Sequence, residues 1–426
     1  MKIREDFLHY LWRMRLFNLE DLATTTDVPI QIINFGELNT NAGPDFLNAK
    51  IKIGDTVWIG NVEMHVKAGE WLKHKHQDDD AYNNVILHVV YDNDETIRRK
   101  TGEPIDALEL RKRIPPKLIG QYIRLMSNEA WIPCQYHFQK ISDITKSLWI
   151  DRLMIERLEG RVETLKNELS VNEYNWEVTF YHRLARNFGA KINTEPFEIL
   201  AKTTPLLTLA KHKSSLFQLE ALIFGQAGFL QEEFVEEYPN ALKKEYDFLQ
   251  KKYNLSPLMP AIWKFMRLRP ANFPTVRLAQ FAALIHQSTH LFSKVLEAES
   301  IESIRKLFED IKVSDYWLTH YKFDKESKKR TKKLGKSTIG LFIINTIVPF
   351  LFYYGREKGL EVYEKRAFKF LEELPPESNH IINKWQDLKY KPVSAYQTQA
   401  LLELKSNYCD QKRCLDCAIG NKILRN

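Results

Sequence analysis

The stretch VWIGNVEMHVK, residues 57–67, gives the strongest indication of the fold in the first quarter of the chain. Apolar and polar residues alternate along it, as in a β-strand whose successive side chains point to opposite faces. The apolar face carries Trp58, Val62, Met64 and Val66, and the other face carries Asn61, Glu63, His65 and Lys67. Burying a carboxylate, an imidazole and an ammonium group costs free energy unless they pair or bind an ion. This strand therefore predicts a polar site.

Other segments around this strand also have the composition of β-strands. Strands are predicted over residues 30–35, 46–53, 57–66, 84–91 and 105–110. Gly54-Asp55 is a hairpin turn signal between the second and third of these strands. Apolar residues recur at helical spacing over residues 2–16, and a short helix is expected over 68–76.

From Pro115-Pro116 onward the apolar periodicity is that of helices. Helices are predicted over residues 149–169, 176–188, 216–224, 241–253, 276–285 and 360–373. The expected fold class is therefore α+β. It comprises a mixed α/β module over residues 1–114 and a large all-α region over residues 115–426, with room for two subdomains.

The composition favours a folded globular protein and argues against a disulfide-stabilised one. A chain of 426 residues exceeds one average core, and 44% hydrophobic with 27% charged residues indicates a folded globular protein. Four cysteines do not make a disulfide scaffold and fit a reducing compartment, so we expect a cytoplasmic protein. The net charge of +7 permits binding to a polyanion without requiring it.

One apolar run, residues 339–354, is nearly free of charge. It contains Asn345 and Pro349, and it is short for a membrane span of ~20 residues. We therefore expect a buried core helix and no membrane attachment. Glu5 and Asp6 in the first helix also do not fit a secretory signal.

Two carboxylates are predicted to meet in the first module. Asp45 begins the strand over 46–53, and the following turn returns the chain antiparallel, which brings Glu63 beside it. Two close like charges are stable when a divalent cation lies between them, and oxygen ligands suit Mg²⁺ or Mn²⁺. Glu5 would be a third acidic group if its stripe of the first helix faces the sheet. The alternative is an exposed strand whose charges form surface ion pairs.

These residues resemble a known family. A helical glutamate, then Pro44-Asp45, then Glu63-x-basic on a strand resembles the PD-(D/E)XK nuclease superfamily, and most closely its Holliday-junction-resolvase branch. The resemblance implies a restriction-endonuclease-like module with Asp45 and Glu63 as metal ligands and Glu5 as the helical glutamate. His65 stands where the family has lysine, and Lys67 on the same face could take its place.

The activity implied by this resemblance is that of a metal-dependent nuclease with nucleic acid as its partner. Mg²⁺ or Mn²⁺ held by Asp45 and Glu63 would polarise the scissile phosphate and lower the pKa of a bound water. His65 or Lys67 would orient that water. The departure at His65 leaves a second interpretation open, an inactive nuclease-like protein that binds nucleic acid or serves as a scaffold.

A second resemblance extends over nearly the whole chain. The strings EDFLHYLW, GELNTNAGPDF, GNVEMHVKAGEW and AYNNVILHVVYDND resemble a bacterial family catalogued as a domain of unknown function. That resemblance implies that the two halves of the chain belong together. It implies no activity.

A histidine-rich patch offers a third interpretation. His74 and His76 in a His-Lys-His run, with His65, Asp80 and His88, could hold a softer metal such as Zn²⁺ in a zinc-dependent hydrolase. Solvated loop histidines are the alternative. A further alternative is that His74 or His76 contacts a phosphate beside the acidic site.

Three of the four cysteines lie within nine residues, as Cys409-x4-Cys414-x2-Cys417. Cys-x2-Cys is a common spacing in metal sites, and Cys134 could complete a second site for structural Zn²⁺ or for an iron–sulfur cluster. Reduced thiols without a metal are the alternative.

Overall fold

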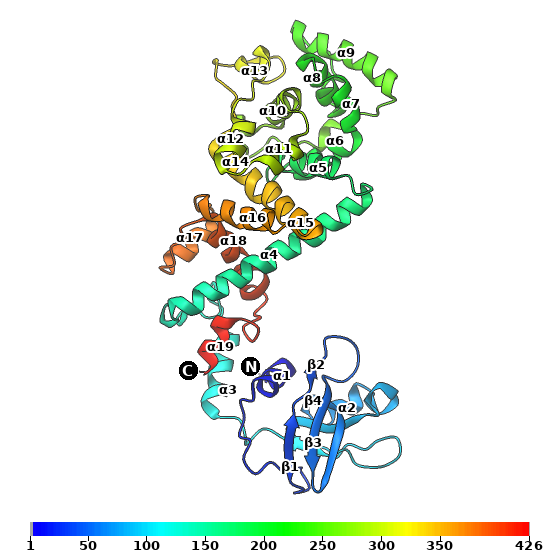
Figure 1. Ribbon diagram of the computed structural model, residues 1–426, viewed down its shortest axis with the longest axis vertical. Helices are drawn as coiled ribbons and strands as arrows, with labels where there is room; N and C mark the ends of the chain where they lie inside the picture. Colours follow the sequence, from blue (N-terminus) through cyan, green and yellow to red (C-terminus); the bar gives the residue numbers. More distant parts are fainter. Residues whose placement is uncertain (1–2, 426) are drawn as a thin grey trace. The chain divides into compact units, whose positions relative to one another are not determined.

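The computed structural model describes residues 3–425, which fall into two compact units (Figure 1). The first unit contains the chain up to Asp151, then Asp387–Lys389, and then the chain from Leu402 onward. The second unit contains Arg152–Gln386 and Tyr390–Leu401. A curled N-terminal sheet followed by a large helical region matches the predicted combination of a mixed α/β part and a helical part. The predicted domain boundary at residue 114 stays a prediction.

The sheet of the first unit has β4 near its centre (Figure 1). The strands run in the order β1-β3-β4-β5-β6, with β2 paired to β3. β1, β3 and β4 are antiparallel neighbours, whereas β5 and β6 continue the sheet in parallel. The elements are α1 (Glu5–Met14), β1 (Ile30–Asn34), β2 (Glu37–Leu38), β3 (Phe46–Ile53), β4 (Thr56–Lys67), α2 (Glu70–Lys73), β5 (Val85–Asp92) and β6 (Ala107–Glu109).

The predicted strands are confirmed to within two residues at each end, and the short β2 was not predicted. The helix predicted over residues 2–16 is α1, and residue 2 lies outside the described part of the chain. The predicted helix over 68–76 is shorter, because α2 ends at Lys73 and a separate 3₁₀ turn begins at His76.

β4 is buried over only half of its length. Its pairing with β5 begins at Asn61, so the residues before that point extend past the neighbouring strand. Trp58 is consequently 49% exposed, and its predicted place on the buried apolar face is wrong. Beyond Asn61 the strand is covered on both faces, and Glu63 and His65 are 3% and 0% exposed.

Helix α1 packs against β4 through its apolar side. Phe7, Leu8, Leu11 and Trp12 are fully buried, and the Trp12 indole N–H donates to the Phe35 carbonyl at 2.9 Å. Residues one helical turn apart share a face, so Glu5 and His9 project from the same part of this helix.

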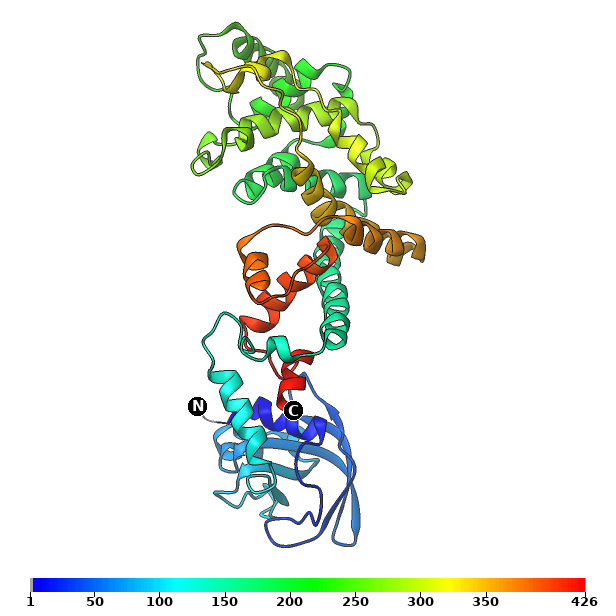
Figure 2. The ribbon, with the colours of Figure 1, turned by 90° about the vertical axis from the view of Figure 1, so that its left-hand side faces the viewer.

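The first unit is completed by helical segments from both ends of the chain. These are α3 (Pro116–Ser127), the start of α4 (Asp143–Val171), a π-helical turn (Leu404–Cys409) and α19 (Ala418–Arg425). The cyan α3 and the red α19 pack against each other (Figures 1 and 2). The first unit therefore combines residues from the two ends of the sequence.

The second unit is helical apart from one short hairpin, β7 (His320–Lys322) and β8 (Lys325–Glu326). The predicted helices are found within it, and α5 has the predicted bounds. Between Arg152 and Glu403 the chain forms the rest of α4, then α5 (Trp176–Phe188), α6 (Thr194–Thr203), α7 (Leu206–Lys211), α8 (Leu216–Gln226), α9 (Glu237–Tyr253), α10 (Pro274–Gln287), α11 (Leu291–Glu297), α12 (Ile301–Glu309), α13 (Asp315–Thr319), α14 (Lys336–Phe342), α15 (Val348–Lys358), α16 (Glu361–Glu373), α17 (His380–Asp387) and α18 (Ala395–Glu403).

The apolar run lies in a continuous helix, Lys336–Lys358, that is long and apolar enough to cross a membrane by length and composition. Within its most apolar window, 72% of the residues are buried inside the protein. A π-helical turn, Ile343–Ile347, joins α14 to α15 and places Pro349 in the first turn of α15, where a missing N–H is tolerated. The predicted core helix is confirmed, and the cytoplasmic location stays a prediction.

Candidate metal centre

The hairpin of β3 and β4 holds Asp45 and Glu63 side by side. Asp45 lies one residue before β3, and Glu63 lies in the buried half of β4. The Asp45 backbone N–H donates to Glu63 Oε2 at 3.1 Å, and the Met64 N–H donates to Asp45 Oδ2 at 2.9 Å. Each carboxylate is therefore fixed by the main chain of the strand that carries the other.

Helix α1 adds a third carboxylate and a histidine. The His9 Nε2 atom lies 3.1 Å from Asp45 Oδ2. Glu5, His9 and Asp45 form one group whose ligand atoms all lie within 4.8 Å of one another, and Glu5, Glu63 and His65 form another. Glu5 is therefore shared between two potential three-ligand sets.

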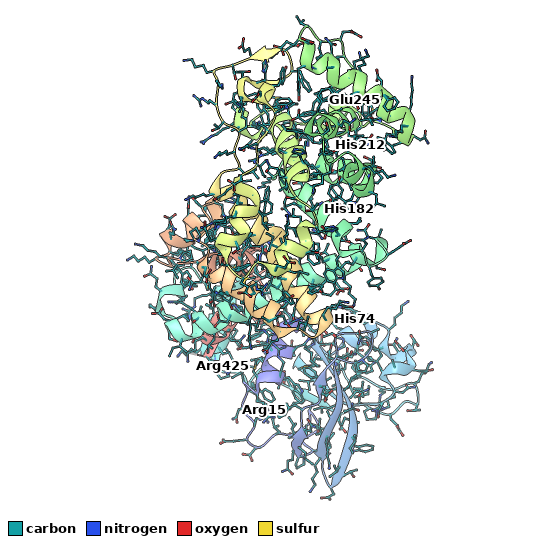
Figure 3. The ribbon with its side chains drawn as sticks, turned by 45° about the horizontal axis from the view of Figure 1, so that its top comes forward. Arg15, His74, His182, His212, Glu245 and Arg425 are labelled. Atoms are coloured by element: carbon teal, nitrogen blue, oxygen red, sulfur yellow. The ribbon has the colours of Figure 1, made fainter. Side chains whose placement is uncertain are left out.

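Histidines surround Glu63 on its other side. His65 Nδ1 and His88 Nε2 are 2.9 Å apart, and His65 Nε2 lies 3.2 Å from His74 Nδ1. His76 Nε2 lies 3.4 Å from Glu63 Oε1. His65, His74 and His76 form a third group of ligand atoms within 4.8 Å of one another. His74 belongs to the first unit, whereas His182 and His212, also labelled in Figure 3, belong to the second.

Three histidine nitrogens in this cluster are buried without a hydrogen-bond partner among the described residues, namely His9 Nε2, His76 Nε2 and His88 Nδ1. Buried polar atoms are nearly always satisfied, so each exception needs a reason. His9 Nε2 and His76 Nε2 face carboxylate oxygens at 3.1 and 3.4 Å. Against the lowering effect of burial, Asp45 raises the pKa of His9, whereas burial lowers the pKa of His76. Imidazoles beside carboxylates are a typical arrangement of metal ligands.

The electrostatics of the cluster show a deficit of positive charge. Burial, and then the charge of Asp45, raises the pKa of Glu63 to about 9 and that of Glu5 to about 7. Burial, and then the neighbouring histidines, lowers the pKa of His65 to about 2 and that of His88 to about 3. Among the described residues, the ion-pair partners of Asp45 and Glu63 are histidines. A divalent cation would supply the missing charge.

Lys67 lies outside this cluster. Its ammonium group is exposed at the end of β4 and lies 3.3 Å from Asp94 Oδ2. The structure thus separates Lys67 from Glu63 and His65, with which the alternation of the strand had grouped it. This separation arises because Lys67 is the last residue of β4, so its side chain extends into solvent.

His9 is the residue that the sequence analysis missed. It lies four residues after Glu5, which is the spacing of neighbours on one helix face, and this was the available signal. Whether the helix turns that face toward Asp45 depends on how α1 packs on the sheet. The local sequence does not determine this packing.

The four cysteines all lie in the first unit. Cys134 follows α3, and Cys409, Cys414 and Cys417 lie between α18 and α19. Cys409 is half-buried and the other three are buried, and all four are free thiols.

Comparison with known proteins gives one finding. A family model described as a protein of unknown function matches residues 5–380. No curated protein and no solved structure matches the chain. The matched region contains the whole carboxylate and histidine cluster and ends before the three C-terminal cysteines.

Proposed function

Since the chain belongs to the family DUF2851, described as a protein of unknown function, we propose from the site itself that it is a metal-dependent nuclease. The divalent cation would be held by Asp45, Glu63 and Glu5, with His9 and His65 as additional ligands. Two observations carry this proposal. Glu5 is shared by two three-ligand groups, one that contains Asp45 and one that contains Glu63, and no lysine or arginine is paired to Asp45 or Glu63 among the described residues. Hard oxygen ligands with one or two imidazoles suit Mg²⁺ or Mn²⁺.

The fold supports the same proposal. A helix that carries Glu5 packs on a mixed sheet, and a hairpin of that sheet carries Asp45 and Glu63. This arrangement fits the restriction-endonuclease-like module that the sequence resemblance implies. We therefore assign the helical glutamate role to Glu5 and the strand ligand roles to Asp45 and Glu63.

A cation in this centre would polarise a phosphoryl oxygen and lower the pKa of a bound water. The protein holds its ligands rigidly, because backbone N–H groups fix Asp45 and Glu63. His74 is exposed and His76 is half-buried at the rim of the cluster. We assign to these two residues the contacts with the scissile phosphate, since their imidazoles can donate to its oxygens.

A basic pocket adjoins the centre and suits a nucleic-acid backbone. Its volume is about 180 Å³, and it shares His9 with the first ligand set. Its charged lining comprises the cations Arg4, Arg13, Lys412 and Arg413 and the anions Asp6 and Asp416. Asp6 pairs with Arg4, and Asp416 pairs with Arg13 and Arg413, so the cations exceed the anions by two. Phosphate contacts of this kind position a polyanion without reading its sequence.

Nuclease activity can be tested with end-labelled single-stranded DNA, duplex DNA, four-way junctions and RNA, incubated with Mn²⁺, with Mg²⁺ or with EDTA. We expect metal-dependent cleavage that falls by about 100-fold or more in Asp45→Asn, because a charged ligand is lost. Asp94→Asn, which changes an acidic residue outside the centre, should retain full activity. Cleavage that persists in EDTA, or that Asp45→Asn leaves unchanged, excludes the proposed centre.

Nucleic-acid binding by a catalytically inactive protein is a second candidate function. It is favoured by His65, which stands in the place of the nuclease family's lysine. The protein would then bind nucleic acid without cutting it. Salt-sensitive binding that survives Asp45→Asn, with no cleavage of any of the four substrates, would establish this alternative.

A zinc-dependent hydrolase is a third candidate, favoured by the close group of His65, His74 and His76. Zn²⁺ accepts such nitrogen ligands at short distances. Stoichiometric zinc in the purified protein, lost in a His74→Ala, His76→Ala double variant but kept in Asp45→Asn, would identify this site.

A further inference from the structure

All four cysteines of the chain belong to the first unit, although Cys134 is far from the others in sequence. The C-terminal segment packs on the chain around Cys134. Lys412 Nζ donates to the Met126 carbonyl at 2.9 Å, and the rings of Trp149 and Tyr408 are 5.3 Å apart. These contacts bring the loop that carries three cysteines to the segment that carries the fourth.

The cysteine side chains are largely buried. Cys134, Cys414 and Cys417 are each 8% exposed or less. Lys405 Nζ lies 5.3 Å from the centre of the Trp131 ring, so the segment before Cys409 also contacts the segment before Cys134. None of the four forms a disulfide.

A donor and a cation lie near the cysteine loop. The Trp149 indole nitrogen is buried without a hydrogen-bond partner among the described residues, and the Trp149 ring lies 5.3 Å from that of Tyr408, the residue before Cys409. Lys412 lies two residues before Cys414. Donors and cations of this kind stabilise thiolates, the form in which cysteine binds metals.

Gly420 shows how closely this loop is folded on itself. A Cβ atom at this position would lie 2.1 Å from the Cys414 carbonyl oxygen, so a side chain cannot be accommodated there without a backbone shift. The start of α19 is therefore packed directly against the loop between Cys409 and Cys417.

We propose that Cys134, Cys409, Cys414 and Cys417 are the ligands of an iron–sulfur cluster. Four thiolates are the common ligand set of such clusters, and the spacing Cys-x4-Cys-x2-Cys with a distant fourth cysteine occurs among them. The buried Trp149 indole nitrogen, which has no hydrogen-bond partner among the described residues, fits an iron–sulfur cluster as well, because hydrogen bonds to the sulfurs are a regular feature of these sites.

The spacing of the sulfur atoms favours iron–sulfur over zinc. A tetrahedral zinc at ~2.3 Å from each sulfur would bring all four sulfurs within ~3.8 Å of one another. Among the described residues, the groups of three ligand atoms that lie within 4.8 Å of one another include no cysteine. In a cluster the thiolates bind different irons, so three of them need not converge on one centre.

The iron–sulfur cluster would also hold one wall of the basic pocket in place. This second role rests on the proposed function, in which that pocket binds nucleic acid. Gln411, Lys412, Arg413, Leu415 and Asp416 of the cysteine loop line that pocket beside His9. A cluster bound by Cys409, Cys414 and Cys417 would fix this wall of the pocket. Its assembly would thereby be coupled to the geometry of nucleic-acid binding.

The test uses the full chain, purified without oxygen and reconstituted with ferrous iron and sulfide. We expect iron and acid-labile sulfide in equal amounts, and a visible sulfur-to-iron absorption that dithionite bleaches. Cys414→Ser and Cys134→Ser should each lose this absorption. Asp416→Asn, in the same loop but without a thiol, should retain it.

Stoichiometric zinc without iron, or a protein that takes up neither iron nor sulfide, would overturn this assignment. A cysteine variant that does not fold leaves the test intact, because the iron and sulfide content of the unmodified protein decides it. Asp45→Asn separates the two proposals. This variant should keep the absorption of the iron–sulfur cluster and lose cleavage. If the unmodified protein holds a full complement of iron but does not cleave, only the nuclease proposal is contradicted.

Discussion

Two buried glutamates, one in each unit, show how the same burial can have different consequences. Glu220 of α8 is fully buried, and the hydroxyls of Tyr238 and Ser314 donate to its Oε2 at 2.5 and 3.0 Å. Glu63 of β4 is as deeply buried, but the group that raises its pKa after burial itself is another carboxylate, Asp45. The two hydroxyl donors bind one oxygen of Glu220, and its Oε1 has no partner among the described residues. Glu63 accepts from the Asp45 backbone N–H but lies beside a second carboxylate, and we expect a bound cation to stabilise that pair.

The largest expected difference between these glutamates is in activity. Glu63→Gln should reduce metal-dependent cleavage by about 100-fold or more, because it removes a charged ligand. Glu220→Gln should leave the rate of the folded protein unchanged, because its carboxyl contacts Tyr238 and Ser314. Initial rates measured on one labelled substrate in saturating Mn²⁺ compare the two variants. If both variants lose cleavage activity to the same extent, Glu63 has no special role as a metal ligand.

The stability of the second unit should depend on pH through Glu220. Burial raises the pKa of this carboxyl from 4.5 to about 7, against the lowering effect of its hydroxyl donors. Because the folded pKa is the higher one, its contribution is full below about pH 4.5 and is lost as the pH rises through about 7, a change of about 3 kcal/mol in the free energy of unfolding. Urea unfolding at pH 5 and pH 8 should show this loss, and Glu220→Gln should abolish it. The exposed Glu372→Gln serves as the control.

A cation should stabilise the first unit. Mn²⁺ at 100 times its Kd should raise the free energy of unfolding by about 2.7 kcal/mol in the unmodified protein. Glu63→Gln should gain nothing from Mn²⁺, yet it should be more stable than the unmodified protein in EDTA at pH 7, because it removes a buried carboxyl that resists ionisation. Thermal unfolding with and without Mn²⁺ measures both effects. A loss of stability in EDTA would show that Glu63 is held by the protein as Glu220 is.

The smallest effect is expected at Lys67. Its pair with Asp94 is exposed, so Lys67→Ala should change the free energy of unfolding by less than about 0.5 kcal/mol. Because Lys67 lies outside the cluster, cleavage should change by less than about twofold. Rates and melting temperatures of this variant can be compared with those of Glu63→Gln. A large loss of cleavage would place Lys67 in the reaction after all.

Local patterns in the sequence were sufficient to predict five of the strands and the meeting of Asp45 with Glu63, but not the order of the strands in the sheet. Alternation gave the bounds of β3 and β4, and a tight turn fixes the register of the hairpin that joins them. Carboxylates eighteen positions apart then come together through the geometry of the hairpin alone.

The rest of the cluster depends on tertiary packing that these patterns do not encode. His9 reaches Asp45 because α1 packs across β4, and His74 and His76 reach β4 because the chain turns back after α2. Trp58 is exposed because β5 does not extend alongside the start of β4. Each of these outcomes depends on where a neighbouring element begins or ends.

The path of the chain between the two units has a consequence for protein engineering. The polypeptide leaves the first unit after Asp151 and returns at Leu402, and near these points the rings of Trp149 and Tyr408 are 5.3 Å apart. In the sequence, the second unit is therefore an insertion into the first unit, apart from the brief return at Asp387–Lys389. We therefore expect that a glycine-serine bridge from residue 151 to residue 402 can replace the intervening helices and give a smaller protein that carries both the carboxylates and the cysteines.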